Sequence, residues 1–123
     1  MVDHVMDIER ETRANEDYRR VLFTGRNLQL VLMTISPGEE IGAEIHEEHD
    51  QFIRVESGSG KVMLDRKEYA VKHGVAVVIP AGVEHNVVNT SSTEALRLYT
   101  LYSPPEHAHR VIHRTKAEER KGH

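Results

Sequence analysis

A spaced series of glycine, proline and polar residues in the second half of the chain separates segments that have the length of β-strands. Its members are Gly74, Pro80, Gly82, His85 and Asn89. The apolar run from Val75 to Ile79 inside it is much shorter than the roughly ten residues of a short helix, so it predicts a buried strand. Glycine permits turns with positive φ and proline lacks a backbone donor, so both residue types mark strand ends.

A second series lies upstream and carries more polar side chains. It consists of Gly38, Glu44, His46, Gln51 and Gly58. Other short runs with strand composition surround the two series, with turn residues between them. We predict these further strands at residues 18–24, 28–36, 41–46, 51–56, 61–65, 68–72, 85–89 and 96–102. Many short strands without helical periodicity predict an all-β sandwich or barrel.

The two ends of the chain differ from this pattern. Residues 1–17 are polar and are interpreted as an N-terminal arm, either a loose strand or a short helix. Residues 106–123 form a C-terminal tail after Pro104 and Pro105. Within this tail, Thr115 and Glu118 have the spacing of a capping box, which predicts one short C-terminal helix.

Composition limits the classes of function. A chain of 123 residues suits one domain, and 20 acidic against 16 basic residues give a net charge of -4. With no dense basic stripe and no long apolar run, neither a nucleic acid nor a membrane is an expected partner. The chain has no cysteine, which excludes disulfides and thiolate sites. The first residues lack the apolar core of a signal peptide, so we expect a cytoplasmic protein.

Strand geometry brings several polar side chains together. Successive side chains of a strand face opposite sides, so Glu44 and His46 share one face while Ile45 points away. Gln51 shares its face with Ile53 and Val55, which are core candidates. If His85 also points inward, four side chains with oxygen or nitrogen lone pairs meet inside the barrel, and a divalent cation would satisfy them.

The two series together, from Gly38 to Asn89, resemble the two sequence motifs of the small single-domain bacterial cupins. The first motif spans residues 38–58 and the second spans residues 74–89. The resemblance implies a double-stranded β-helix, also called a jelly-roll barrel, over residues 18–105. It also implies a homodimer, and a metal held by three histidines and a glutamate.

The ligand set departs from that family pattern at two positions. His46 and His85 stand where the family has histidines, whereas Glu44 takes the first histidine position and Gln51 takes the glutamate position. Two imidazoles and one carboxylate still form a facial triad, which suits manganese, iron, zinc or nickel with open coordination positions. Gln51 is a weaker ligand than a carboxylate, and orienting a ligand or a water molecule is its alternative role.

Each of these residues also has a purely structural interpretation. His85 could line the core with its ring satisfied by a backbone carbonyl, and Glu44 could pair with Arg54 or Arg97. His49 lies in an acidic loop near the pocket mouth, where the sequence favours a solvated histidine and the alternative is a replacement for a missing metal ligand. We assign His107 and His109 to a surface tail. We assign His113 to the surface as well, with an acid or base role near the barrel mouth as the alternative.

Two classes of function follow. The first is a metal-dependent enzyme, isomerase-like or dioxygenase-like, that acts on a small oxygen-rich metabolite, with Glu44 as the candidate catalytic residue. The second is a non-catalytic cupin that binds or senses a small ligand. In either case, apolar side chains on outer strand faces, such as Ile45 and Phe52, suit pairing with a second copy.

Overall fold

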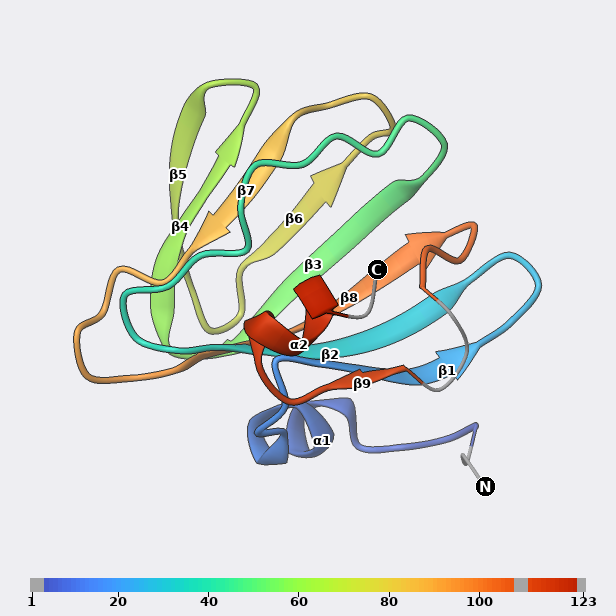
Figure 1. Cartoon of the computed structure of the whole chain (residues 1–123), viewed down its shortest axis with the longest axis horizontal. Helices are drawn as coiled ribbons and strands as arrows, with labels where there is room; N and C mark the ends of the chain where they lie inside the picture. The colour runs from blue at the N-terminus through green and yellow to red at the C-terminus, as the bar shows by residue number, and fades with distance from the viewer. Residues whose placement is uncertain (1–3, 108–110, 122–123) are drawn as a thin grey trace.

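The computed structural model describes residues 4–107 and 111–121, and its side chains are described as far as Glu118. Strands dominate the chain, and a short helix lies near each end (Figure 1). The elements are α1 (Ile8–Ala14), β1 (Arg19–Thr24), β2 (Gln29–Ile35), β3 (Asp50–Ser57), β4 (Ser59–Leu64), β5 (Lys67–Lys72), β6 (Ala76–Ile79), β7 (His85–Val88), β8 (Leu96–Ser103), β9 (Ile112–His113) and α2 (Lys116–Lys121).

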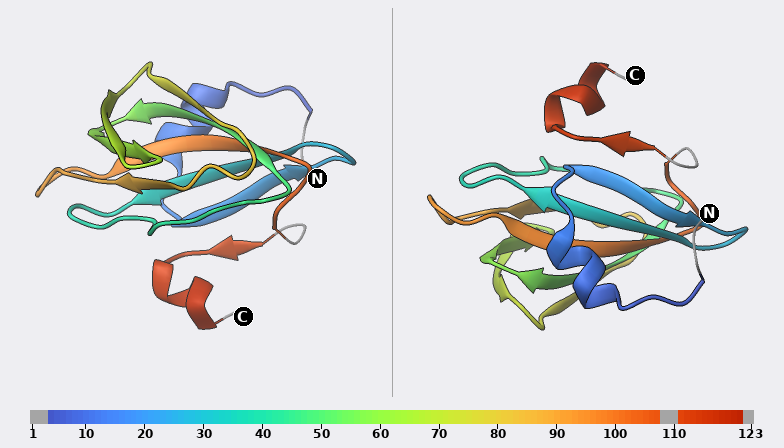
Figure 2. Two further views of the ribbon diagram at one scale, coloured as in Figure 1. Left: turned by 90° about the horizontal axis from the view of Figure 1, so that it is seen from above. Right: turned by 90° about the horizontal axis from the view of Figure 1, so that it is seen from below.

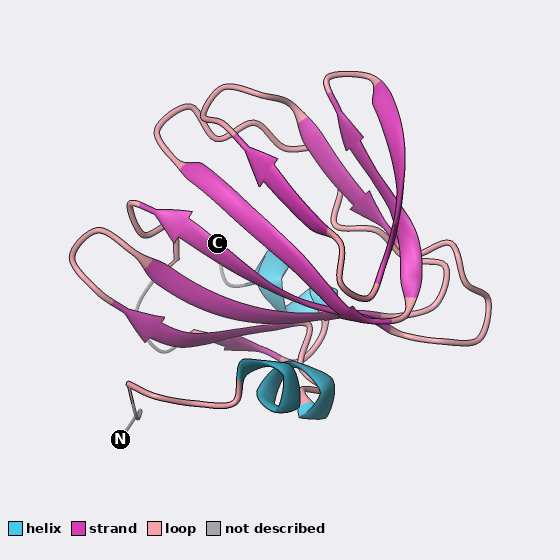
Figure 3. Cartoon of the chain, turned by 180° about the vertical axis from the view of Figure 1, so that it is seen from behind, coloured by secondary structure: helices cyan, strands magenta, loops and turns pink. Residues whose placement is uncertain are grey.

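The strands form two antiparallel sheets that face each other. The larger sheet has the order β6-β3-β8-β2-β1-β9, and the smaller one has the order β5-β4-β7. Seen from behind, the strands spread like a fan and converge at one end (Figure 3). The predicted all-β jelly-roll is confirmed. The strands β1 and β2, and likewise β4 and β5, are consecutive antiparallel neighbours, so each pair forms a hairpin.

The core lies between the sheets because side chains alternate along the strands. In β3, Gln51, Ile53 and Val55 are buried, whereas Phe52 and Arg54 are partly exposed. The paired strand β8 alternates in the same way, so its buried residues continue the same inner face. Full burial of each such aliphatic side chain contributes about 1.5–3 kcal/mol.

The predicted strand at residues 41–46 is wrong. This stretch belongs to the connection between β2 and β3, and it pairs with β7 only through isolated bridges at Glu40 and Glu44. Gly42 has a φ of 107°, which no regular strand residue adopts. Its N–H is instead bound by the side-chain oxygen of Asn86 at 2.9 Å. The connection thus follows β7 without becoming a strand of the sheet.

The strand predicted at 75–79 exists as β6, but its predicted burial is wrong. β6 is an edge strand of the larger sheet and pairs only with β3 among the named strands. Its side chains alternate between buried Val77 and Ile79 and exposed Ala76 and Val78. One face of this apolar run therefore contacts solvent.

Both helices lie outside the sheets. α1 begins after Asp7, whose side chain accepts a hydrogen bond from the N–H of Arg10, and it contacts β3 and β8. The predicted C-terminal helix is confirmed as α2, where the N–H of Glu118 donates to Thr115 Oγ1. Figure 2 shows α1 and the β9–α2 segment on opposite sides of the strands. Neither described helix has the length and apolar composition needed to cross a membrane.

Candidate metal centre

Backbone pairing places Glu44 directly opposite His85. The N–H of each residue donates to the carbonyl oxygen of the other at 2.9 Å, so the two form a closely spaced antiparallel pair. His85 is the first residue of β7. His46 lies two residues after Glu44, and its carbonyl oxygen accepts from the N–H of Gly82 at 2.9 Å. Backbone bonds to β7 and to the turn before it thus hold all three residues.

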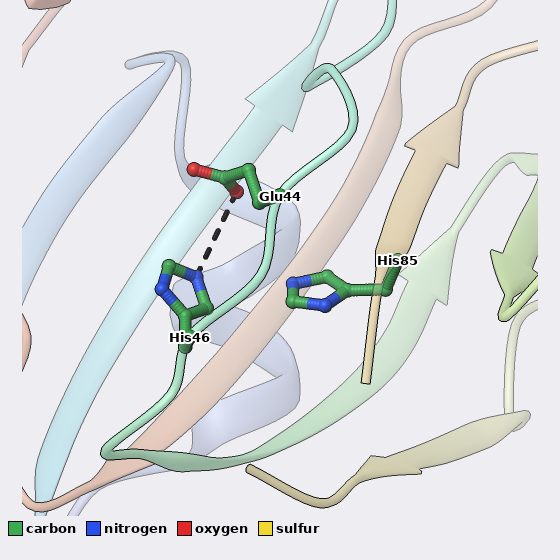
Figure 4. A group of neighbouring side chains, drawn as sticks. All are labelled: Glu44, His46 and His85. Carbon is green, nitrogen blue, oxygen red and sulfur yellow. Dashed lines mark ion pairs between the residues drawn. The ribbon is translucent and has the colours of Figure 1, made fainter. Parts of the chain in front are cut away.

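The side chains of Glu44, His46 and His85 converge inside the barrel. Glu44 and His46 extend from the β2–β3 connection, and the ring of His85 reaches towards them from β7 (Figure 4). One nitrogen or oxygen atom from each residue lies within 4.8 Å of the other two. His85 is 4% exposed, and the side chains of His46 and Glu44 are 12% and 34% exposed. The cluster therefore combines a buried side with an open one.

The two imidazoles present unpaired nitrogens to this cluster. Nε2 of His46 and Nε2 of His85 are both buried, and neither has a hydrogen-bond partner among the described residues. Nδ1 of His85 lies 2.9 Å from the carbonyl oxygen of Val83. A carbonyl can only accept, so Nδ1 carries the proton and Nε2 keeps its lone pair. The structural interpretation of His85 accounts for only one of its two nitrogens.

Gln51 points to the same interior, as predicted. It is 6% exposed, and its Nε2 donates to Thr100 Oγ1 at 3.0 Å. Its Oε1 is buried and has no hydrogen-bond partner among the described residues. With its nitrogen bound to Thr100, the amide presents its oxygen, an acceptor, as the end without a partner.

The structural alternatives for Glu44 are wrong. Arg54 pairs with Glu56 at 3.2 Å, and Arg97 pairs with Glu16 at 2.7 Å. The nearest ionisable partner that the structure shows for Glu44 is His46, at 3.9 Å between Oε1 and Nε2. The carboxylate therefore faces the two imidazoles and not an arginine.

The donor set fits a divalent metal ion. Bonds of about 2.1 Å place two ligands of one ion about 3 to 4 Å apart, so small side-chain rotations would bring these three atoms into range. Two imidazole nitrogens and a carboxylate oxygen suit manganese, iron, zinc or nickel. The unpaired buried atoms also give a reason for binding, because a buried polar atom without a partner is unfavourable.

His49 is not the solvated histidine that the sequence favoured. Its Nδ1 lies 2.7 Å from the carbonyl oxygen of Pro104, and its Nε2 lies 2.6 Å from Glu106 Oε2. The other carboxylate oxygen of Glu106 lies 3.7 Å from Nδ1 of His46. Neither sequence motif includes Glu106, so the sequence did not indicate this residue. The one local signal was an acidic residue directly after the proline pair.

His107 is not on a surface tail, and this prediction was also wrong. Its ring stands edge-on against Tyr102, with 5.2 Å between the centroids. Burial, followed by the positive charge of Arg19, lowers the pKa of His107 from 6.5 to about 3, and its Nε2 has no hydrogen-bond partner among the described residues. His109 lies outside the described residues.

His113 belongs to β9, where it pairs with Arg19 of β1. It is half-buried, and its Nδ1 is buried without a hydrogen-bond partner among the described residues. His113 is therefore only partly exposed at the surface position that the sequence predicted. Its alternative role as an acid or base stays a prediction.

Comparison with known proteins places these residues in a family context. The family described as "Cupin domain" matches residues 31–102. The uncharacterized protein YrkC of Bacillus subtilis (strain 168) is 42% identical over 120 residues, which are 93% of this chain but only 64% of YrkC. Protein L612 of Acanthamoeba polyphaga mimivirus is 44% identical over 108 residues, covering 85% of this chain and 67% of L612. The chain thus spans about two thirds of the length of these relatives.

A solved structure matches over almost its whole length. The crystal structure of BH2720 from Bacillus halodurans has a TM-score of 0.93 and is 43% identical. The match covers 98% of this chain and 99% of that one.

Proposed function

The chain belongs to the cupin domain family, and on this premise we propose that it binds one divalent metal ion through Glu44, His46 and His85 and acts on a small oxygen-rich metabolite. One observation carries the proposal. Two buried imidazole nitrogens that have no hydrogen-bond partner in the described part of the chain face a carboxylate within 4.8 Å. A cluster maintained only for packing would satisfy these atoms internally.

When bound, the ion supplies Lewis acidity towards a carbonyl or enediol oxygen, or a binding position for dioxygen beside the organic ligand. The chain's own side chains orient that ligand. Gln51 offers its free amide oxygen to a ligand hydroxyl, because Thr100 already holds its amide nitrogen. Glu44 is the most exposed of the three proposed ligands, and the carboxylate oxygen that does not bind the ion is the candidate for moving a proton. An isomerase-like or a dioxygenase-like reaction follows from these roles.

Metal content tests the proposal directly. Protein purified without chelator should contain close to one equivalent of manganese, iron, zinc or nickel, measured by elemental analysis. The variants His85→Ala and Glu44→Gln should lose the metal, whereas His73→Ala, at an exposed turn, should keep it. Protein that is free of metal, and that takes up none of these ions when they are added, would refute the site.

The alternative of a non-catalytic binding or sensing cupin has its own outcome. If metal is bound and a screen of small hydroxy, keto and enediol compounds shows binding without turnover, the chain is a binding protein. Turnover that requires Glu44 would support the enzyme.

We also propose a homodimer formed through the outer face of the larger sheet. Strand register aligns Val78, Phe52, Leu101 and Leu30 in one apolar row across four strands. Val78 is 66% exposed. A second copy would cover this row. The mass in solution, measured by light scattering, should therefore be that of a dimer for wild type and that of a monomer for Val78→Lys. The control variant Thr90→Lys should remain a dimer. A wild-type protein with the mass of a monomer would refute the proposal.

A further inference from the structure

The segment from Pro104 to His107 is fixed beside the candidate metal centre by one buried side chain. Gln29 is fully buried. Its Oε1 accepts from the N–H groups of Glu106 at 3.1 Å and His107 at 2.9 Å. Its Nε2 donates to the carbonyl oxygen of His107 at 2.7 Å and to Thr24 Oγ1 at 2.9 Å. The amide uses its full hydrogen-bonding capacity, so the backbone at Glu106 is held in one place.

From this position, the Glu106 side chain bridges two histidines. Oε2 lies 2.6 Å from His49 Nε2, and Oε1 lies 3.7 Å from His46 Nδ1. The other nitrogen of His49 lies 2.7 Å from the Pro104 carbonyl oxygen. The Pro104 carbonyl and the Glu106 carboxylate can each only accept, so His49 bridges them by donating from both nitrogens, which requires a proton on each. The Glu106 carboxylate is therefore anchored on one side and faces His46 on the other.

This contact decides which nitrogen of His46 is available. A carboxylate beside Nδ1 favours the tautomer with its proton on Nδ1. Nε2 then keeps its lone pair, and Nε2 is the atom that faces Glu44. The carbonyl of Val83 accepts a hydrogen bond from Nδ1 of His85 at 2.9 Å, whereas Glu106 acts on Nδ1 of His46 through its charge at 3.7 Å. Each imidazole of the cluster thus has an acceptor behind it.

We propose that Glu106 is a positioning residue of the metal centre, which holds His46 in the tautomer and orientation needed to bind the ion through Nε2. This inference rests on the proposed function. Carboxylates that accept from the far nitrogen of a metal-binding histidine typically raise metal affinity about 10- to 100-fold. Glu106 lies outside both sequence motifs and comes from the chain segment after the last core strand.

Zinc affinity measures the effect. Purified wild type, Glu106→Ala and Glu106→Gln are titrated with Zn²⁺ in competition with a chromophoric chelator. Glu106→Ala should bind Zn²⁺ about 10- to 100-fold more weakly. Glu106→Gln keeps one acceptor oxygen without the charge and should lie between wild type and Glu106→Ala. Glu68→Ala, which removes an exposed glutamate paired with Lys61, should bind like wild type.

A second readout does not depend on the metal. Long-range ¹H–¹⁵N NMR of the metal-free protein reports the tautomer of His46. Wild type should show the proton on Nδ1, and Glu106→Ala should shift the ring towards the Nε2–H form. A residue that only supported the fold would change the unfolding midpoint and leave this tautomer ratio unchanged. If Glu106→Ala does not fold, the weaker Zn²⁺ binding and altered His46 spectrum of Glu106→Gln decide the question.

The outcomes separate this inference from the proposed function. If wild type binds no Zn²⁺, manganese, iron or nickel, the metal centre itself is refuted, and a metal-positioning role for Glu106 falls with it. If wild type binds Zn²⁺ and both Glu106 variants match its affinity and its His46 tautomer, the metal centre stands and the positioning role is overturned.

Discussion

Acidification should unfold this protein partly through His107. Burial and the nearby charge of Arg19 hold the pKa of His107 at about 3, against 6.5 in the absence of these effects. Between these two values the unfolded chain binds a proton that the folded chain rejects. The stability associated with neutral His107 is therefore fully present above pH 6.5 and is lost as the pH falls towards 3.

The size of the effect follows from the pKa difference. Each pH unit between the two pKa values changes the free energy of unfolding by about 1.4 kcal/mol per proton. Acidification from pH 7.5 to 4.5 crosses about two such units, which amounts to a loss of about 3 kcal/mol from this one ring.

Urea unfolding in the presence of a chelator tests the reasoning. Wild type and His107→Phe, which keeps an aromatic ring against Tyr102, are unfolded at several pH values between 4.5 and 7.5. The other histidines are present in both proteins, and because the charges of His46, His113 and His49 also lower the pKa of His107, the difference measures His107 together with this coupling. That difference should change by about 3 kcal/mol across the range, in favour of the variant at low pH. A difference that stays constant within about 0.5 kcal/mol would show that His107 is not held neutral by its surroundings.

Three substitutions test other features of the structure. Gln29→Leu leaves the N–H groups of Glu106 and His107 without their acceptor, so it should cost about 2–4 kcal/mol in urea unfolding and weaken Zn²⁺ binding as Glu106→Ala does. Asn89→Ala removes an amide that donates to two backbone carbonyls, at 2.9 and 2.8 Å, and the midpoint of thermal unfolding should fall by several degrees. Gly58 has a φ of 87°, and Gly58→Ala would place a Cβ 2.4 Å from a backbone oxygen. The free energy of unfolding, followed by circular dichroism, should therefore fall by at least about 2 kcal/mol. Unchanged stability would show that this position is not strained.

The alternation of side chains along a strand predicted the inward-facing part of the site, because this alternation depends only on neighbouring residues. Gln51, Ile53 and Val55 alternate with exposed positions in any extended chain, so the buried position of Gln51 could be predicted from the sequence. The convergence of His46 with His85 followed from the two spaced motifs. The structure confirms that these side chains converge. Their role as metal ligands stays a proposal.

Sheet order could not be predicted in the same way. The apolar composition of Val75–Ile79 indicates a strand but does not say how many neighbours that strand has, and β6 proved to be an edge strand. Residues 41–46 have strand composition as well. The positive φ of Gly42 and its hydrogen bond to Asn86, 44 positions away, interrupt regular pairing there.

The second half of the site escaped prediction because its contacts join distant parts of the chain. His49 meets the Pro104 carbonyl across 55 positions, and Gln29 meets His107 across 78 positions. No periodicity or motif records such a pair. Besides the acidic residue after the proline pair, a glutamine at the start of the apolar strand β2 was an available signal, since a polar side chain on a core face needs a partner.

The paired backbone of Glu44 and His85 has a consequence for how this chain resists unfolding. These residues enclose a loop of about 40 positions, and closing a loop of that length is entropically costly for a disordered chain. The sequence has no cysteine to tie such a loop shut. An ion bound by both side chains would act as a reversible cross-link at this point. Metal supply would then set thermal stability as well as chemistry, and the melting temperature would report occupancy.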